Sequence, residues 1–508
     1  MWVVGSLIAS FLLLLVIWLN VPGTVWFVYR QWKAVRHIPG WPTHWLYGNL
    51  HQIRLNQETA LAYREWVRKH RWRISRSWLG PFYAIVNIHH PDPLRKLMKE
   101  PKARDVYDCL LPWLGEGLLI AEGDKWHRNR HLLTPAFHFS ILKSYVTIYS
   151  DCVQTLIKKW EATAVTKEPV KLFDTVSLLS LDIILQCAFS YKSDCQHSAA
   201  QKKYVRAVVD LSFVVSERLM NPLYRINWLY WLTPHGRRMK RLCKLVHDHA
   251  EMVIEERKKA LGLDKNRKVS DTTTFLENIS KSRQLDFLDI LLTAMDENGV
   301  GLTDLEIRNE VDTFMFEGHD TTTSGMCWTL YCLARHPEHQ EKVREEVRSV
   351  LMGREQLEYD DLKELKYTQW CIKEAMRLYP PVSLIFRQLG EDLEIEGHVL
   401  PKGTRCSIPI RGFHTNPEVW PNPDEFDPLR FHPSNAEGRD PYAYLPFSAG
   451  YRNCIGQNFA LNEEKMVVAS LLNRFRLTVN EDHKVEWVPR LILRAVDDIK
   501  VNIEQLRQ

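Results

Sequence analysis

The sequence predicts a mainly helical protein with a small β-rich part, preceded by a single membrane-spanning helix. Three observations support this prediction. Residues 1–29 carry no charged side chain, and 2–19 are almost wholly apolar. Residues 77–88 hold two apolar runs joined at Gly80-Pro81, which is typical of a β-hairpin. Most of the later chain shows the apolar spacing of amphipathic helices, and its longest helical pattern covers 303–335.

Length and composition point to a large globular chain. Its 508 residues correspond to roughly three domains or one unusually large one. Apolar residues make up 45% and charged residues 25%, which excludes a disordered chain, a collagen and a coiled-coil rod. The net charge of +5 is too small for a nucleic-acid binder, so we expect no nucleic acid as partner. Ten scattered cysteines without a C-x-x-C pair indicate reduced thiols in a cytosol-like compartment.

Residues 1–29 are predicted to be a membrane anchor, because about 20 apolar residues suffice to cross a bilayer as a helix. A cleaved signal peptide would carry a basic start and a small-residue cleavage site, and neither is present. The other alternative, a buried core helix, would need partners before any domain has begun. Arg30, Lys33 and Arg36 follow directly, and cationic flanks stay in the cytosol. We therefore expect a single-pass protein of the endoplasmic reticulum membrane whose body faces the cytosol.

The remainder divides into a basic, proline-containing hinge at 30–44 and one large body at 45–508. The hinge contains the stiff sequence Pro39-Gly40-Trp41-Pro42. Within the body, the polar stretch 262–283 is predicted to be a surface loop, and 286–292 to begin a short amphipathic helix.

The longest predicted helix has a weak centre. It begins at a capping box formed by Thr303 and Glu306 and runs to about Arg335, roughly 50 Å at 1.5 Å per residue. Its middle, 318–325, consists of poor helix formers whose Thr and Ser side chains compete for backbone hydrogen bonds. This predicts a local opening of the helix at a functional site. The alternative is a surface helix interrupted by a loop.

The most informative stretch is 447–456, in which Gly450 and Gly456 flank Cys454. An apolar-periodic helix follows directly, so its N-terminal N–H groups and dipole should stabilise a thiolate, and Arg452 adds positive charge. Zinc is poorly supported because no C-x-x-C or histidine pair lies nearby. One thiolate with open space suits a metal whose other ligands come from a macrocycle. We expect the other nine cysteines to be inert core residues.

The pattern F-x-x-G-x-R-x-C-x-G over 447–456 resembles the haem-binding signature of the cytochrome P450 family. Further features match in the expected order. They are W-x-x-x-R at 126–130, the oxygen-activation stretch at 318–321, E-x-x-R at 374–377 and P-x-R-F at 428–431. The resemblance covers about 40–505 and implies the cytochrome P450 fold. It also implies that the body, 45–508, is a haem-thiolate monooxygenase domain.

The resemblance also implies a role for each matching residue. Cys454 would be the axial thiolate on the iron of haem b, with Phe447 packed beside it. The side chains that would bind the haem propionates are Trp126, Arg130, Arg387 and Arg452. A buried structural triad would comprise Glu374, Arg377 and Arg430. Thr321 would hydrogen-bond dioxygen and Asp320 would relay protons to it.

Glu317 and its neighbours indicate which branch of the family the sequence resembles. Residues 314–322 are similar to the fatty-acid ω-hydroxylase branch, often called family four, in which this glutamate can be esterified to a haem methyl. That implies hydroxylation of fatty acids or related lipids at or near the ω carbon. We expect 108–118 and 382–386 to line the substrate pocket. Tyr451 departs from the branch, which commonly has proline there, and this loop before the thiolate could differ in stiffness.

Electrons must come from a partner, because the chain contains no flavin or nicotinamide fingerprint. The resemblance implies NADPH–cytochrome P450 reductase, with cytochrome b5 as a second candidate. A basic docking face is predicted for Lys125, Arg128, Arg452 and Lys465, the alternative being ordinary solvated surface. Three other functions stay open: an orphan monooxygenase of xenobiotics or steroids, a haem-thiolate isomerase or dehydratase that needs no reductase, and a non-enzymatic haem carrier.

Overall fold

The computed structural model describes residues 25–506 except 82, 193, 264–284 and 297–298, and it is mainly helical, as predicted. Residues 25–35 are helical. The α-helices that follow are α2 (Gln57–Lys69), α3 (Pro91–Leu97), α4 (Arg104–Tyr107), α5 (Leu111–Leu114), α6 (Gly123–Leu133), α7 (Phe139–Thr166), α8 (Leu172–Phe189), α9 (Ala199–Met220), α10 (Asn227–Leu232), α11 (Pro234–Ala260), α13 (Phe287–Thr293), α14 (Asp304–Arg335), α15 (Pro337–Leu351), α16 (Lys366–Leu378), α17 (Ile410–His414), α18 (Pro433–Ala436) and α19 (Gln457–Arg474). Short 3-10 helices lie at Asp108–Leu110, Thr134–Phe137, Pro222–Arg225, Tyr359–Lys363, Pro428–Phe431 and Pro441–Ala443.

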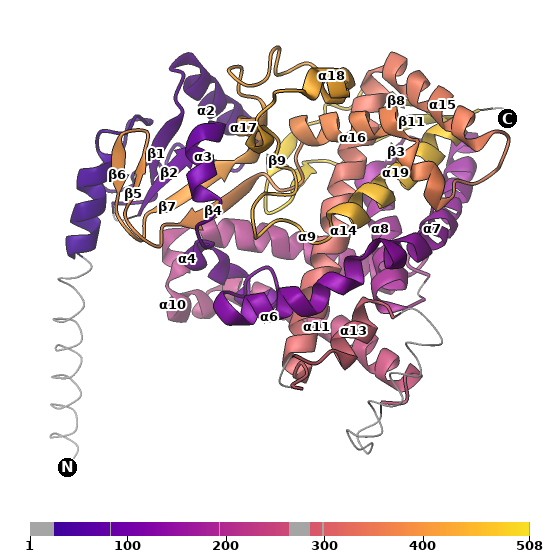
Figure 1. The fold of residues 1–508 in the computed structure, drawn as a ribbon, viewed down its shortest axis with the longest axis horizontal. Coiled ribbons are helices and arrows are strands. Elements are labelled where there is room, and N and C mark those ends of the chain that lie inside the picture. Colours follow the sequence, from indigo (N-terminus) through magenta and orange to yellow (C-terminus); the bar gives the residue numbers. More distant parts are fainter. Residues whose placement is uncertain (1–24, 82, 193, 264–284, 297–298, 507–508) are drawn as a thin grey trace.

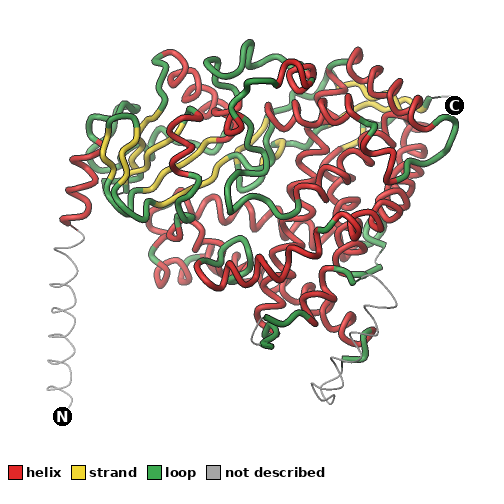
Figure 2. Tube along the Cα trace, in the orientation of Figure 1, coloured by secondary structure: helices red, strands yellow, loops and turns green. Residues whose placement is uncertain are grey.

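The strands gather mainly at one end of the molecule, and the helices occupy the other (Figures 1 and 2). The strands are β1 (Ile74–Trp78), β2 (Ala84–Ile88), β3 (Val170–Lys171), β4 (Leu384–Gln388), β5 (Leu393–Ile395), β6 (His398–Leu400), β7 (Arg405–Pro409), β8 (Phe475–Val479), β9 (Trp487–Pro489), β10 (Leu493–Ala495) and β11 (Lys500–Gln505). The largest sheet has the order β1-β2-β7-β4.

The predicted hairpin is confirmed as β1 and β2, which pair antiparallel with Ile74 opposite Ile88. In the same sheet β7 runs parallel to β2, and β4 pairs antiparallel with β7 so that Arg387 lies opposite Cys406. Alternate side chains point to opposite faces, and this sheet covers the smaller of two hydrophobic cores. The larger core is formed by the helices.

Helix α14 crosses the larger core and packs against α8, α19, α16 and α11 (Figure 1). It begins at the predicted capping box, in which Thr303 accepts from the Glu306 N–H and Glu306 from the Thr303 N–H. The helix is continuous through 317–325, so the predicted opening is not observed and the interrupted-helix alternative is excluded. Threonine hydroxyls instead donate to carbonyls one turn earlier, as Thr321 does to Glu317 at 2.6 Å.

The predicted anchor lies outside the described residues, apart from 25–29. Within the described part of the chain, the one helix long and apolar enough to cross a membrane is α8. Because 83% of that helix is buried against the rest of the protein, it is a core helix. The expected surface loop at 262–283 also falls outside the description, except for 262–263. The short helix predicted from 286 is confirmed as α13, which begins at a capping box of Asp286 and Asp289.

The segment 30–44 is not a hinge standing apart from the body. Val35 and Ile38 are buried in the core beneath the large sheet. The Arg76 N–H donates to the Pro39 carbonyl at 2.7 Å, which ties this segment to β1. A Cβ atom on Gly40 would lie 2.4 Å from the Arg76 carbonyl oxygen, so only glycine permits this approach. Proline and glycine here shape a segment that packs against the body.

Candidate functional site

The site is built around the loop that ends in Cys454, just before α19. The Cys454 N–H donates to the Phe447 carbonyl at 3.0 Å, which folds the loop back on itself and places Phe447 beside the cysteine. Gly450 has φ +72°, and a Cβ there would lie 3.0 Å from the Met98 carbonyl oxygen. None of the ten cysteines forms a disulfide in the described part of the chain, and nine of them are buried. Cys454 alone is exposed, so it is the thiol that a ligand could reach.

The surroundings of Cys454 both raise and lower the pKa of its thiol. Burial by surrounding protein raises the pKa of this thiol to about 12, although its sulfur remains open on one side, and the Glu317 charge raises it further. The Gly456 N–H, Arg130 and Lys102 lower it, but burial outweighs them. The Gly456 N–H at the start of α19 acts in the direction that the sequence predicts. Binding of a metal cation would itself deprotonate the thiol.

Three cationic side chains from separate elements gather near this cysteine. Lys102 precedes α4, Arg387 lies on β4 and Arg452 lies in the cysteine loop. Burial lowers the pKa of Lys102 to about 7, with Arg452 and Arg387 lowering it further while Glu317 and Cys454 raise it. The cations are therefore close enough to repel one another.

Arg387 shows that the cluster of Lys102, Arg387 and Arg452 lacks an anionic partner in the described part of the chain. Its side chain is 1% exposed, yet the guanidinium makes one hydrogen bond, from Nη1 to the Phe386 carbonyl at 3.3 Å. Its Nε and Nη2 atoms have no partner among the described residues. A buried cation with unused donors is costly unless an anion binds it. The two propionates of haem fit this need, so the residues present suit that group.

Trp126 and Arg130 come to the same region from α6. The Arg452 guanidinium lies 4.5 Å above the Trp126 ring and donates to the Ala121 carbonyl at 2.9 Å. Arg130 donates to the carbonyl and side chain of Asn453 at 3.0 and 3.1 Å, so it also clamps the cysteine loop. Tyr451, the departure from the branch, packs edge-on against Trp126 with ring centroids 5.4 Å apart. The loop is thus held by an aromatic contact where the branch has proline.

A short strip of α14 faces this site. In the described helix, every position from Asn309 to Ala334 is buried except Glu317, Gly318 and Thr321. Burial by protein raises the pKa of Glu317, while Lys102 and Arg452 lower it. The Glu317 charge in turn raises the pKa of Cys454, so the carboxylate of the strip lies close enough to the thiol to interact with it electrostatically.

The two residues predicted as catalytic do not meet in this structure. Thr321 belongs to the accessible strip, whereas Asp320 is fully buried and forms an ion pair with Arg494 on β10. The second Asp320 oxygen, Oδ2, has no partner among the described residues. The Arg494 guanidinium itself lies 5.1 Å from the Phe173 ring centroid.

Sequence reasoning missed Lys102, Arg494 and Glu310. Lys102 and Arg494 come from regions without a motif, so only the folded chain brings them to the site. Glu310 lies two turns before Glu317 on the same face of α14. Its carboxylate accepts from the Leu118 N–H at 3.0 Å and from the Asn129 side chain at 2.8 Å. Burial raises its pKa to about 7. Its place seven residues before Glu317 was the one available signal.

The structure brings the three triad residues together. Glu374 and Arg377 on α16 form a doubly hydrogen-bonded pair with both distances at 2.7 Å. Arg430 approaches the same carboxylate at 3.3 Å. All three are buried, and Arg377 also donates to the carbonyls of His414, Pro423 and Glu425. These partners saturate Arg377, which fits a structural role.

The predicted basic docking face is wrong. Lys465 is buried and donates to the Leu362 carbonyl at 2.8 Å, and Arg452 is buried in the site. Lys125 pairs with Glu116 at 3.0 Å, and Arg128 pairs with Asp296 at 3.2 Å. Burial and neutralisation leave no open cationic face at these four positions. Sequence spacing alone did not reveal the acidic partners.

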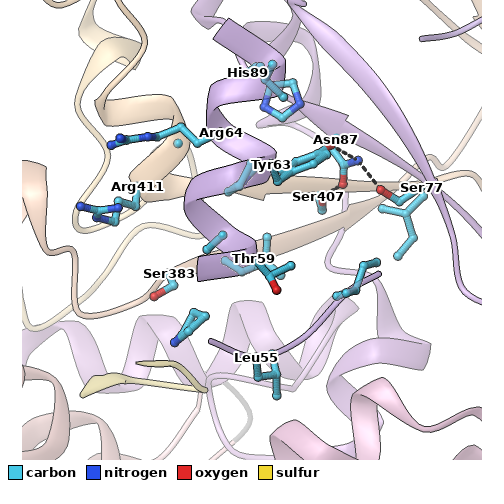
Figure 3. A pocket seen from close by; sticks show the side chains of 18 of the residues that line it. Leu55, Thr59, Tyr63, Arg64, Ser77, Asn87, His89, Ser383, Ser407 and Arg411 are labelled. Atoms are coloured by element: carbon cyan, nitrogen blue, oxygen red, sulfur yellow. Dashed lines mark hydrogen bonds between the residues drawn. The ribbon is translucent and has the colours of Figure 1, made fainter. Parts of the chain in front are cut away.

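A cavity of about 660 Å³ lies between α2, the large sheet and the end of α9 (Figure 3). It does not include Cys454, but Tyr107, Leu110 and Phe386 line the end that adjoins the cationic cluster. The Phe386 N–H donates to the Tyr107 hydroxyl at 3.3 Å. Both predicted lining segments contribute in part: Leu110 from 108–118, and 383, 384 and 386 from 382–386.

Comparison with known proteins agrees with this geometry. The family model described as Cytochrome P450 matches residues 38–502. The chain is 43% identical over 505 residues to "Cytochrome P450 4B1" of Rattus norvegicus, covering 98% of this chain and 96% of that protein. It is 41% identical to "Cytochrome P450 4F2" of Homo sapiens, over 100% and 98% of the two chains. It is 42% identical to "Leukotriene-B4 omega-hydroxylase 3" of Mus musculus, over 94% and 92%.

The fold and the cysteine site define a haem-thiolate monooxygenase that takes electrons originating from NADPH through a reductase. The chain belongs to the cytochrome P450 family, and its similar proteins are family-four members.

Proposed function

We propose that this chain hydroxylates fatty acids or related lipids at or near the ω carbon. The observation that carries the proposal is Glu317, the carboxylate in the accessible strip of α14 that faces Cys454. The similarity to a protein named as a leukotriene-B4 ω-hydroxylase supports the same substrate class. The cavity supports it as well, because apolar side chains dominate its lining.

Haem, when bound, supplies the iron that activates dioxygen. Cys454 would bind that iron through its sulfur, with Phe447 packed beside the cysteine. The propionate-binding set comprises Trp126, Arg130, Arg387 and Arg452. To it we add Lys102, whose pKa is influenced by the same cations. Its Nζ donates to the Leu119 carbonyl at 2.7 Å and lies 5.1 Å from the Tyr107 ring centroid. Glu374, Arg377 and Arg430 hold the framework below the cysteine loop.

Protons are supplied from α14 in this proposal. Thr321 Oγ1 holds its proton toward the Glu317 carbonyl, and rotation about the Cα–Cβ bond turns that hydroxyl into the accessible space. Asp320 is held by Arg494, so a relay from its carboxylate requires it to exchange Arg494 for Thr321 or a water. Hydrophobic packing around the strip excludes bulk water from this path.

A membrane location is supported by the chain's own surface. Large apolar side chains are exposed in residues 25–35 and in residues 223–232, which include α10. They include Trp26, Trp32, Leu223, Trp228 and Leu232. Aromatic residues of this kind favour membrane interfaces. We propose that residues 1–29 anchor the protein in the endoplasmic reticulum with domain 45–508 in the cytosol. Its electron donors there would be NADPH–cytochrome P450 reductase and, secondarily, cytochrome b5.

The test is to determine which carbon of a fatty acid the protein hydroxylates. The full chain is reconstituted with the reductase in phosphatidylcholine vesicles and incubated with saturated fatty acids of graded length. We expect hydroxylation mainly at the terminal carbon, dependent on NADPH and reductase. Turnover of a peroxide without reductase would instead identify an isomerase. Products from steroids but not from lipids would identify an orphan monooxygenase, and spectral binding without any product would identify a carrier.

We propose further that Glu317 can be esterified to a haem methyl group. A carboxylate oxygen would bond to the methyl carbon as one C–H bond breaks and its hydrogen leaves as a proton. The two electrons released in this oxidation would go to the dioxygen that the monooxygenase reaction already consumes and reduces to water. The ester would restrict how a chain end approaches the iron, which matters because terminal C–H bonds are stronger than internal ones. Mass spectrometry after acid–solvent extraction should find haem retained on the wild-type chain. The Glu317→Ala variant should release its haem and shift products toward internal carbons. Complete release of haem from the wild type would contradict the ester.

A further inference from the structure

The cavity of Figure 3 carries far more positive than negative charge. Seven arginines line it, against one carboxylate residue, Glu418, among the described residues. Most of its remaining lining is apolar or uncharged. An apolar cavity with excess cationic charge is suited to an amphipathic anion rather than to a neutral hydrocarbon.

For six of these arginines the positive charge is already balanced by a nearby carboxylate, stacked on an aromatic ring or screened by solvent. Arg64 and Arg68 share Asp424, at 2.7 and 2.8 Å. Arg490 stacks 4.5 Å above Phe213 and feels the opposite charges of Glu217 and Asp210. Arg225 stacks 4.0 Å above Tyr83, whose hydroxyl donates to Asp105. Arg54 and Arg71 are exposed, so water screens them.

Arg411 is the exception. Its Nε donates to the Leu378 carbonyl at 2.7 Å, and its guanidinium lies 4.4 Å from the Trp487 ring centroid and 5.6 Å from that of Tyr379. No carboxylate of the described residues forms an ion pair with it. Burial lowers the pKa of Arg411 to about 10, and Arg64 and Arg68 lower it while Asp424 raises it. The side chain remains cationic at neutral pH. An anion beside it would offset the cost of burying its charge and the repulsion from Arg64 and Arg68.

Ser383 provides a second donor on the same side of the cavity as Arg411. Its carbonyl accepts from the Ile410 N–H at 2.9 Å, which sets Ser383 alongside the start of α17, the helix that carries Arg411. Its Oγ is buried and has no partner among the described residues. Both residues line the cavity, and the close-up shows them on the same side of it. A guanidinium and an unused hydroxyl together form a site for a carboxylate.

We infer that Arg411 and Ser383 bind the carboxylate of the lipid substrate, so that its chain runs through the cavity toward Tyr107 and the cysteine site. This inference rests on the proposed function, because it assigns the polar end of the lipid whose other end is oxidised. It makes Arg411 a positioning residue, which selects acids over neutral chains of equal length. A carboxylate fixed at Arg411 and Ser383 would leave the terminal carbon as the part free to reach the cysteine site.

The test compares two ligands that differ in one end group. Dodecanoate and 1-dodecanol are titrated into the full-length holoenzyme in phosphatidylcholine vesicles, which lack anionic lipid that could compete, and binding is read from the Soret absorbance. We expect Arg411→Gln to weaken dodecanoate about tenfold, the effect of one charge-assisted hydrogen bond, and dodecanol by less than about twofold. Ser383→Ala should reduce the preference for the acid less, and Arg411→Lys should retain part of it.

Arg71→Gln is the matched control, since it removes an exposed arginine from the same cavity and should change neither ligand by more than about twofold. The reduced carbon monoxide spectrum checks that each variant holds its haem. Equal weakening of both ligands in Arg411→Gln, or no change in either, would overturn the inference. Failure of the proposed function is separate: the wild type would then prefer dodecanoate in the titration yet oxidise neither ligand at its terminal carbon.

Discussion

Arg377 and Arg387 are both buried arginines near the cysteine loop, but their surroundings differ completely. Every nitrogen of Arg377 donates a hydrogen bond, two of them to Glu374. Arg387 makes one long hydrogen bond and leaves two nitrogens without a partner in the described chain. The contrast teaches that a saturated buried charge belongs to the framework, whereas an unsaturated one indicates a ligand that the chain is built to hold.

The largest effect is expected when the saturated region is broken. Glu374→Ala leaves Arg377 and Arg430 buried without their carboxylate, which should lower the free energy of unfolding by about 3–5 kcal/mol. Denaturant unfolding of the purified variant, or its failure to accumulate as folded protein, measures this. The matched control is Asp248→Asn, which breaks the exposed pair with Lys244 and should leave the unfolding midpoint unchanged. Equal stability of Glu374→Ala and wild type would contradict the framework role.

At Arg387, where two guanidinium nitrogens have no partner in the described chain, substitution is not expected to lower stability. Arg387→Met removes a buried charge without a partner, so the haem-free protein should be as stable as wild type or more stable. Haem affinity should fall about 10- to 100-fold, because charge-assisted hydrogen bonds to a propionate are lost. Haem transfer to apomyoglobin gives the affinity, and denaturant unfolding of the haem-free chain gives the stability. A variant that loses stability but keeps its haem would place Arg387 in the framework instead.

Glu463 is a buried carboxylic acid that can be compared with the two buried arginines. Glu463 on α19 accepts from Ser180 at 2.8 Å but lacks a cation, and burial raises its pKa to about 8. The folded state therefore holds a proton that the unfolded state releases above its ordinary pKa of about 4.5. Stability due to this group is fully present below that value and falls as pH rises toward 8.

Glu463→Gln removes this dependence while keeping an acceptor for Ser180. We expect its unfolding free energy to decline less steeply between pH 5 and 8, by up to about 1.4 kcal/mol per pH unit. Unfolding curves across that range provide the measurement. Parallel pH profiles for variant and wild type would show that Glu463 is ionised in the folded protein.

Local patterns predicted the framework well because their physics is local. The capping box at Thr303, the hairpin at 77–88 and the helix after Cys454 depend on neighbours within a few residues. Charge partners are a different matter, because Glu116 and Asp296 neutralise the predicted docking face from other elements. Lys102, Arg494 and Arg411 likewise have no motif of their own, and only the fold brings them to the cysteine site, to Asp320 and to the cavity.

The smallest effect is expected where an aromatic ring, rather than a charge, supports the site. Tyr451→Ala removes the edge-on contact with Trp126, worth about 0.5–1.5 kcal/mol, but leaves Arg452 above the same ring. Stability should fall by that amount, and haem affinity should fall far less than in Arg387→Met, since no hydrogen-bond donor to the propionates is lost. Tyr451→Phe, which keeps the ring, should match wild type in both measurements. Haem loss as large as that of Arg387→Met would mean that the stiffness of the cysteine loop, and not its cations, controls retention.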